Sequence, residues 1–163
     1  MDITDLKLAS LLQAQGRVTN VELSRQSGLA PSTTLERVRR LEERGVITGY
    51  HARLDPHALG LRVQAMVQIN LNRHEPGVID AFEEQVRNVP EVKACYHVTG
   101  QYDYILHVVV RDIDHLRELA KHTLAGLRGL EKQETFLILS TVKEDDGYAL
   151  ESVRAGSPTT QEG

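Results

Sequence analysis

The fold is decided by the stretch PSTTLERVRRLEER, residues 31–44, whose spacing is typical of an amphipathic helix. Leu35, Val38 and Leu41 follow one another at steps of three and form an apolar stripe along one side. The other side of this predicted helix is polar and basic. It carries four residues at steps of three or four, namely Thr33, Arg37, Arg40 and Arg44.

Two starts are compatible with this helix. Pro31 can occupy the first helical position, where its missing N–H costs nothing. Alternatively, Thr33 and Glu36 can form a capping box. Gly45 is expected to end the helix. A short helix with an apolar back and a basic front can enter a DNA major groove, although the same charges can also form a solvated face.

The residues before this helix favour the DNA-binding alternative. A first helix is predicted over residues 2–15, where leucines recur at helical spacing before Gly16. Thr19 and Glu22 form a capping-box pattern that opens a second helix, and Gly28 ends it. Two short helices joined through a glycine turn, the second of them basic, are typical of a helix-turn-helix behind a supporting first helix.

Composition limits the class of protein. The chain has 163 residues, of which 40% are hydrophobic and 26% charged, which suffices for one domain or two small ones. No charged-then-apolar leader opens the sequence, and its apolar runs are far shorter than a membrane span. We therefore expect a cytoplasmic protein without membrane contact. The single cysteine, Cys95, excludes an internal disulfide and any multi-cysteine zinc site.

Charge is distributed unevenly along the chain. The net charge is −4, but residues 1–53 carry eight Lys/Arg against six Asp/Glu, whereas the remainder carries 11 against 17. A mildly basic front part on an acidic body fits a DNA-reading module attached to a second domain. Because the excess is small, tight binding to DNA requires several copies of the module or low salt.

The second half of the chain alternates with a period of two from Leu61 onward. Strands are predicted near residues 61–72, 92–99, 104–110 and 133–142, with one helix after the first strand and another after the third. This order predicts an α+β fold, with a winged helix-turn-helix followed by a ferredoxin-like βαββαβ domain that has an antiparallel sheet. The predicted domains are 1–50 (helix-turn-helix), 51–60 (linker or wing strand), 61–145 (ferredoxin-like) and 146–163 (flexible tail).

A ferredoxin-like sheet leaves one face without helices. Alternation predicts a mixed polar and apolar surface on that face, which we expect to pack against a second copy of the chain in a homodimer. The alternative is a face open to solvent. The predicted face carries Gln64, Met66, Gln68, Cys95, His97 and His107.

Several motifs together resemble the Lrp/AsnC (leucine-responsive, or feast/famine) transcription regulators. They are NVELS (20–24), GL (28–29), LERVRRLE (35–42), GVITGY (45–50), LNR (71–73) and CYHVTGQYDY (95–104), and the resemblance covers residues 2–145. It implies an N-terminal DNA-binding domain, a C-terminal domain that binds an effector, usually an amino acid, and dimers that often assemble to octamers.

Two positions depart from the family pattern. Ala30 stands where many members have serine, which weakens a cap there and favours Thr33 as the capping residue. The turn reads Gly100-Gln101-Tyr102-Asp103, whereas the family usually has Gly-Asp-aromatic-Asp. The loss of one carboxylate is expected to change which effector is preferred.

For DNA, we assign the hydroxyl residues at the start of the third helix to groove entry, where they can reach phosphates or base edges. Arg37 is the predicted base reader because a guanidinium can bind guanine N7 and O6 together. Arg39 is expected to form an ion pair with Glu42 or Glu43 instead. The predicted DNA-binding residues are Ser32, Thr33, Thr34, Arg37, Arg40 and Arg44.

For the effector, the turn from Thr99 to Asp103 is the candidate site. Gly100 allows close backbone approach, exposed amides can hold a carboxylate, and Asp103 can accept an ammonium. The alternative is a structural hairpin turn in which Tyr102 covers a sheet edge. The predicted effector-binding residues are Thr99, Gly100, Gln101, Tyr102 and Asp103.

No sequence feature commits the chain to catalysis. A serine–histidine pair, a phosphate-binding glycine loop and a paired-carboxylate motif are all missing, and the seven histidines do not form a metal-ligand set. We therefore predict a DNA-binding transcription regulator, not an enzyme, without cofactor or metal, controlled by an amino acid. The alternatives are an enzyme similar to the siroheme decarboxylases, which share this two-domain plan, and a ligand-sensing partner protein.

Overall fold

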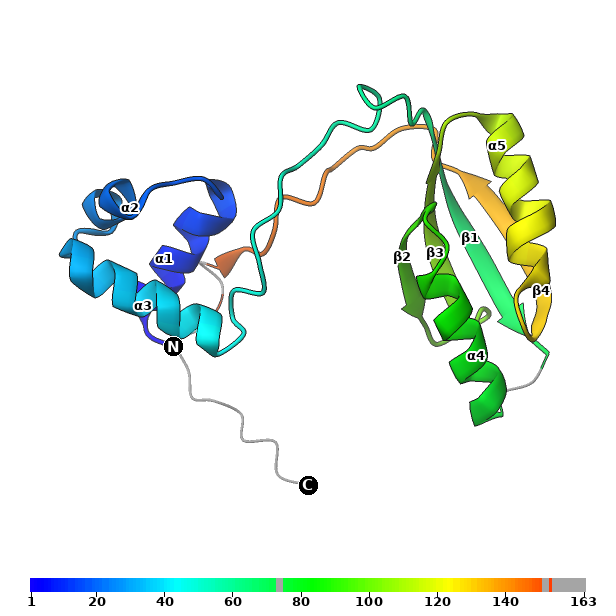
Figure 1. Cartoon of the computed structure of the whole chain (residues 1–163), viewed down its shortest axis with the longest axis horizontal. Coiled ribbons are helices and arrows are strands. Elements are labelled where there is room, and N and C mark those ends of the chain that lie inside the picture. The colour runs from blue at the N-terminus through cyan, green and yellow to red at the C-terminus, as the bar shows by residue number, and fades with distance from the viewer. Residues whose placement is uncertain (73–74, 151–152, 154–163) are drawn as a thin grey trace. The chain divides into compact units, whose positions relative to one another are not determined.

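The computed structural model describes residues 1–72, 75–150 and 153. The chain divides into two compact units. One unit comprises Met1–Arg53 and a C-terminal segment that begins at Lys143, and the other is Leu54–Val142. Figure 1 shows three helices in the first unit and a sheet with its helices in the second. In the described part of the chain, no helix is long and apolar enough to cross a lipid bilayer.

Three helices form the N-terminal unit: α1 (Ile3–Ala14), α2 (Asn20–Ser27) and α3 (Pro31–Glu43). Asp2 caps α1 in a reciprocal capping box. At α2, half of the predicted capping box is present: the Thr19 hydroxyl accepts a hydrogen bond from the Glu22 amide, whereas the Glu22 carboxylate binds Arg25 and Gln26. The unit's core consists of buried leucines from all three helices: Leu8, Leu12, Leu23 and Leu41.

Helix α3 begins at Pro31, with Ala30 as a cap residue whose side chain makes no hydrogen bond. The alternative start at Thr33 is therefore wrong. The predicted apolar stripe is also shifted, because Thr34 is fully buried while Leu35 is 59% exposed. The core positions of α3 follow a step of four and then three, from Thr34 through Val38 to the buried Leu41.

The chain after α3 differs from the expected wing. Among the described residues 44–62 there is no strand, so the predicted short strand is absent. Ile47 instead packs against the three-helix core. The C-terminal segment completes this unit, because the Gln13 amide exchanges two hydrogen bonds with the backbone of Tyr148 and Arg53 forms ion pairs with Glu144 and Asp146.

Residues 146 and 148 of the predicted flexible tail therefore make defined contacts with this unit. Residues 151, 152 and 154–163 of that predicted tail lie outside the described residues.

The second unit has four strands: β1 (Val63–Leu71), β2 (Val92–His97), β3 (Tyr104–Val110) and β4 (Leu130–Leu137). They form an antiparallel sheet with the order β2-β3-β1-β4, as expected for the ferredoxin-like arrangement. Its helices lie on one face of the sheet (Figure 1). The last strand both begins and ends earlier than predicted, because its pairing with β1 runs from Leu130, opposite Leu71, to Leu137, opposite Ala65. The helical elements are α4 (Pro76–Arg87), α5 (Ile113–Glu118), a short π-helix (Leu119–Thr123) and a 3-10 turn (Leu124–Gly126).

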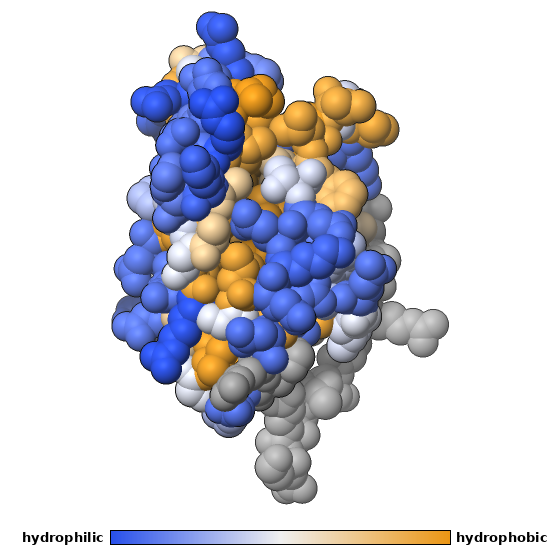
Figure 2. Space-filling view, turned by 90° about the vertical axis from the view of Figure 1, so that its right-hand side faces the viewer, coloured by the Kyte–Doolittle hydropathy of each residue, from blue (hydrophilic) through white to orange (hydrophobic). Residues whose placement is uncertain are grey.

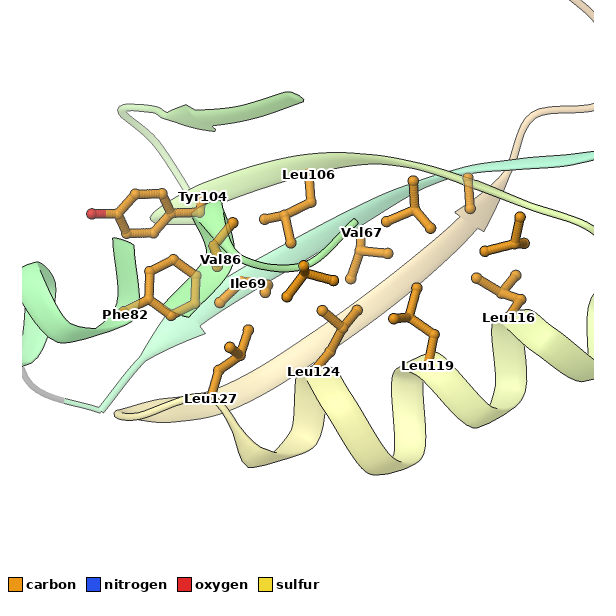
Figure 3. Close-up of a cluster of buried hydrophobic side chains, with 14 of the residues drawn as sticks. Val67, Ile69, Phe82, Val86, Tyr104, Leu106, Leu116, Leu119, Leu124 and Leu127 are labelled. Carbon is orange, nitrogen blue, oxygen red and sulfur yellow. The ribbon is translucent and has the colours of Figure 1, made fainter. Parts of the chain in front are cut away.

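The core of this unit lies between the sheet and its helices, where aliphatic side chains from both layers interdigitate (Figure 3). At one end the rings of Phe82 and Tyr104 lie 4.6 Å apart, centre to centre. Gly129, which precedes β4, has φ +79, and a Cβ there would lie 2.3 Å from the Val78 side chain. Glycine is required at this position because both the backbone conformation and the neighbouring side chain exclude a larger residue.

The face of the sheet without helices differs from the prediction on β2. Cys95 pairs with the buried Leu106, and His97 pairs with Tyr104 and stacks on its ring at 4.6 Å, so both side chains lie on the helix side. Paired residues in a sheet point the same way, and a register shift between Val92 and Ala94 sets this phase. The outer face therefore carries Ala94 and Tyr96 on β2, together with the predicted Gln64, Met66, Gln68 and His107.

Some large apolar side chains remain at the surface of the second unit. Tyr96 is 57% exposed, Ile113 54% and Phe136 48%. Figure 2 shows one side of the molecule, on which apolar side chains reach the surface in patches that hydrophilic side chains separate.

Candidate nucleic-acid interface and effector turn

The helix pair α2–α3 is held in a fixed arrangement at its turn. The Asn20 side-chain amide donates to the Pro31 carbonyl oxygen at 2.9 Å, which joins the first residues of the two helices. At the end of α2, Gly28 adopts φ +77 and the Leu29 amide donates back to the Ser24 carbonyl oxygen at 3.1 Å. These bonds direct one face of α3 away from the core.

The outward face of α3 carries hydroxyl and charged side chains. Ser32 and Thr33 are exposed in its first turn, and Arg40 and Arg44 are exposed near its end. Within the described residues, neither Arg40 nor Arg44 forms an ion pair. Arg39 pairs with Glu43 at 2.8 Å, which confirms the expectation that it is bound to a neighbouring carboxylate.

Thr34 lies on the opposite side of α3 and is fully buried. Its hydroxyl donates to the Ala30 carbonyl oxygen at 3.1 Å. The structure thus places Thr34 in the core, apart from the other predicted DNA-binding residues of α3. The reason is the phase of the helix, since the Thr34 position faces the leucine core and its hydroxyl finds a partner within its own helix.

Arg37 lies between the core and the surface, with a side chain 23% exposed. Its Nη1 atom is 2.7 Å from a carboxylate oxygen of Asp2 and 2.7 Å from one of Asp5. The hydrogen bond that Arg37 donates holds the pKa of Asp2 below its ordinary value. Arg37 thus joins α3 to the start of α1, and its guanidinium, predicted to read bases, is engaged by two carboxylates in this structure.

At the effector turn, Gly100 adopts φ +124, which only glycine reaches without strain. Asp103 ties the turn to β1 in two ways. Its amide donates to the Ile69 carbonyl oxygen at 2.9 Å, and its Oδ2 atom accepts from the Leu71 amide at 2.8 Å. Asp103, which the sequence predicts to accept an ammonium group, thus holds the turn in place in this structure.

A small polar pocket lies beside this turn and is lined by Asn70, Gln101, Tyr102, Glu131 and Lys132. The Asn70 side chain donates to the Gln101 carbonyl oxygen at 2.8 Å, and the Tyr102 hydroxyl donates to Glu134 at 2.9 Å. Of the predicted effector residues, Gln101 and Tyr102 line the pocket.

Charge in this pocket centres on an ion pair between Lys132 and Glu134. The hydrogen bond from Lys132, with that from Tyr102, lowers the pKa of Glu134, and the bond to Glu134 raises the pKa of Tyr102. The sequence prediction of the effector site did not include the pocket residues of β1 and β4, which are Asn70, Glu131 and Lys132. The strand order of the predicted fold, with β4 beside β1, is the signal that indicates them.

No metal centre is evident in the part of the chain that the structure describes: no group of three or more His, Cys, Asp or Glu side chains is placed to hold an ion. The candidate functional residues are those of the α3 face and of the polar turn.

Two family models match the chain. A winged helix-turn-helix DNA-binding model matches residues 1–48, and the Lrp/AsnC ligand binding domain model matches residues 64–148. The chain is 38% identical over 152 residues to the leucine-responsive regulatory proteins of Klebsiella pneumoniae and of Escherichia coli K12, and the match covers 93% of this chain and 93% of each relative.

Solved structures of transcriptional regulators also superpose on this chain. A transcriptional regulator from Neisseria meningitidis in complex with L-Met superposes with a TM-score of 0.85 at 33% identity, covering 88% of this chain and 93% of that one. An AsnC family transcriptional regulator from Agrobacterium tumefaciens superposes with a TM-score of 0.88 at 28% identity, covering 94% of this chain and 99% of that one.

Proposed function

We propose how this chain, which belongs to the Lrp/AsnC family of DNA-binding transcription regulators, recognises its DNA and its effector. The N-terminal unit binds double-stranded DNA through the outward face of α3, and the C-terminal domain binds a small-molecule effector, an amino acid. The observation that carries the DNA-binding part is the arrangement of α3, whose back is packed and whose front presents Ser32, Thr33, Arg40 and Arg44. In this proposal the two hydroxyls enter the major groove and the two arginines grip phosphates.

An electrophoretic mobility shift titration at several salt concentrations tests the DNA-binding part. Arg40→Ala should weaken binding to all sequences and reduce the salt dependence by about one phosphate contact. Arg39→Ala is the matched control, because that guanidinium is already paired with Glu43 and its loss should have a smaller effect. Equal effects of the two variants would contradict the assignment.

The effector is proposed to be an amino acid bound at the pocket beside the Thr99–Asp103 turn. The pocket is lined by a carboxylate at Glu131 and amide groups at Asn70 and Gln101, which suit the ammonium and carboxylate groups of a zwitterion. Lys132 also lines the pocket, and its ammonium is paired with Glu134, so a ligand carboxylate has to compete with Glu134 for it. The bound L-Met of the Neisseria meningitidis relative supports this ligand class. Isothermal titration with each of the twenty standard amino acids tests it. The absence of heat with all of them, in protein that binds DNA, would contradict it.

The outer face of the sheet is proposed as a homodimer interface, and the dimers as units of a larger assembly, an octamer. Tyr96 and Phe136 are about half exposed on this face, at 57% and 48%, and lie among smaller polar side chains. Sedimentation of Tyr96→Asp should show a shift to monomer at micromolar concentration. Ile113→Asp, at an equally exposed apolar residue at the start of α5 on the helix side of the sheet, is the control and should leave assembly unchanged.

A regulator that acts on DNA belongs in the cytoplasm, which is where we place this one. We infer that it is not an enzyme, since the relatives found are named as transcription regulators. The siroheme-decarboxylase-like alternative has no support among them. A tetrapyrrole absorbance band in purified protein that fails to bind DNA would restore that alternative.

A further inference from the structure

One charged side chain on the outward face of α3 has a role that phosphate binding does not explain. Glu36 is exposed, and it has no hydrogen-bond or ion-pair partner among the described residues. Every other carboxylate of α2 and α3 has one: Glu22 binds Arg25 and Gln26, Glu42 binds the Tyr50 hydroxyl, and Glu43 binds Arg39.

The position of Glu36 places it inside the proposed contact with DNA. It follows Ser32 by four residues and precedes Arg40 by four, so all three lie on one side of α3. Arg40 is also unpaired within the described residues. The centre of this face therefore combines a free carboxylate with a free guanidinium.

A carboxylate at this place opposes simple binding to the phosphate backbone. Its charge has the same sign as the phosphates, and the repulsion lowers affinity for DNA of any sequence. A partner with hydrogen-bond donors offsets that cost. In the major groove such donors are the exocyclic amino groups of cytosine and adenine.

Of these two bases, cytosine suits a carboxylate better. Cytosine presents only its N4 amino donor in the major groove, whereas adenine presents the N7 acceptor beside its N6 donor, and that lone pair repels a carboxylate. Guanine presents two acceptors, and thymine an acceptor and a methyl group, so both are disfavoured.

We propose that Glu36 is a specificity-determining residue that accepts a hydrogen bond from the N4 amino group of one cytosine in each half-site. This inference rests on the proposed entry of α3 into the major groove. Arg40, one turn further along α3, holds an adjacent phosphate and offsets the repulsion between the carboxylate and the backbone.

The test is selection of bound sequences from a random double-stranded DNA pool by the full chain and three variants. The native chain should enrich a cytosine at one fixed position of each half-site. Glu36→Ala should lose that preference, with discrimination reduced about tenfold at this position only. Glu36→Gln should shift the preference toward adenine, whose N6 and N7 an amide can bind together.

Glu43→Gln is the matched control. It removes the same charge from the same helix, at a carboxylate that is already paired with Arg39. It should change affinity for all sequences alike and leave the selected bases unchanged. Circular dichroism verifies that the variants fold.

The outcomes separate this inference from the proposed function. If the native chain selects a site and both Glu36 variants select the same one, Glu36 does not determine specificity, although the DNA-binding function holds. If the native chain binds no DNA even at low salt, the proposed function fails and this inference fails with it.

Discussion

Replacing Thr34 by valine tests whether the inner face of α3 is correctly separated from its outer face. Thr34 is fully buried, and its hydroxyl donates to the Ala30 carbonyl oxygen at 3.1 Å. The same carbonyl also accepts the Thr34 amide at 2.9 Å, so it keeps a partner when the hydroxyl is removed. Valine has nearly the same shape, and the buried position 34 lies apart from the face of α3 proposed to contact DNA. We therefore expect Thr34→Val to bind DNA like the native chain.

The expected change in stability follows from two opposing contributions. Loss of the hydroxyl's hydrogen bond costs about 1 kcal/mol. Replacement of a buried hydroxyl by a methyl group returns a similar amount, about 1 kcal/mol or more. The free energy of unfolding of Thr34→Val should thus lie within about 1 kcal/mol of the native value. Thr34→Ser, which keeps the hydroxyl but deletes a buried methyl, should lose about 1 kcal/mol.

Thr33 is the control because it is adjacent and exposed. The free energy of unfolding of Thr33→Val should lie within about 0.5 kcal/mol of the native value, as is usual for surface substitutions. The variant should nevertheless bind DNA more weakly. Urea unfolding followed by circular dichroism measures stability, and fluorescence anisotropy with labelled DNA measures binding. A Thr34→Val protein of native stability that binds DNA tenfold more weakly would refute the assignment of Thr34 to the core.

Three further predictions concern other parts of the chain. Gly129→Ala should destabilise the C-terminal unit by at least about 1 kcal/mol, because φ is +79 there, whereas Gly126→Ala, in open space, should be near neutral in the same thermal unfolding assay. Arg37 lowers the pKa of Asp2, so the pair stabilises the fold fully above the ordinary Asp pKa, and this stabilisation is lost as the pH falls through the lowered pKa. The thermal unfolding midpoint of Arg37→Met should therefore fall less than that of the native chain between neutral pH and about pH 3. Tyr102→Phe removes a hydroxyl from the pocket lining, together with its hydrogen bond to Glu134, and should weaken effector binding about fivefold by calorimetry. An unchanged affinity would place the effector elsewhere.

Local signals made much of the fold predictable. The cap at Thr19 and the glycines after α2 and α3 satisfy the helix ends by interactions within a few residues, so the sequence carries that information locally. The order of strands and helices follows from changes between periods of two and 3.6, and the antiparallel sheet with its crossing order follows from that.

Which side of a helix or strand faces the core was harder to predict than the presence of that helix or strand. On β2, polar and apolar residues occur on both sides, so alternation alone does not distinguish the helix side from the outer side. The pairing of Cys95 with Leu106 decides it, and that pairing depends on a register shift that no local pattern indicates. On α3 one of the two buried residues is a threonine beside an exposed leucine, because the helix phase is set by packing against α1 and α2 rather than by hydrophobicity.

Contacts between residues far apart in sequence account for the remaining differences. The carboxylates that engage Arg37 lie 32 and 35 residues earlier in the chain, and the Asp103 carboxylate binds the backbone of β1, 32 residues away. Both side chains look like ligand-binding groups when only their neighbours in sequence are considered. A charged residue is available for a ligand only if the fold does not already satisfy it.

The unpaired cations on α3 lead to a last prediction about how many units bind DNA together. Arg37 and Arg39 are paired with carboxylates. Among the described residues, the unpaired cations on the outward face of α3 are therefore Arg40 and Arg44, the latter just after the end of the helix. Each phosphate neutralised contributes about −0.9 to the slope of log K against log salt concentration, so one unit should give a slope of roughly −2 and a pair of units roughly −4. Titrations on DNA fragments that hold one or two half-sites measure this. A slope near −2 on the paired fragment would contradict binding by two linked units. A slope near −4 on a single half-site would mean that cations outside α3, such as Arg17, also grip the backbone.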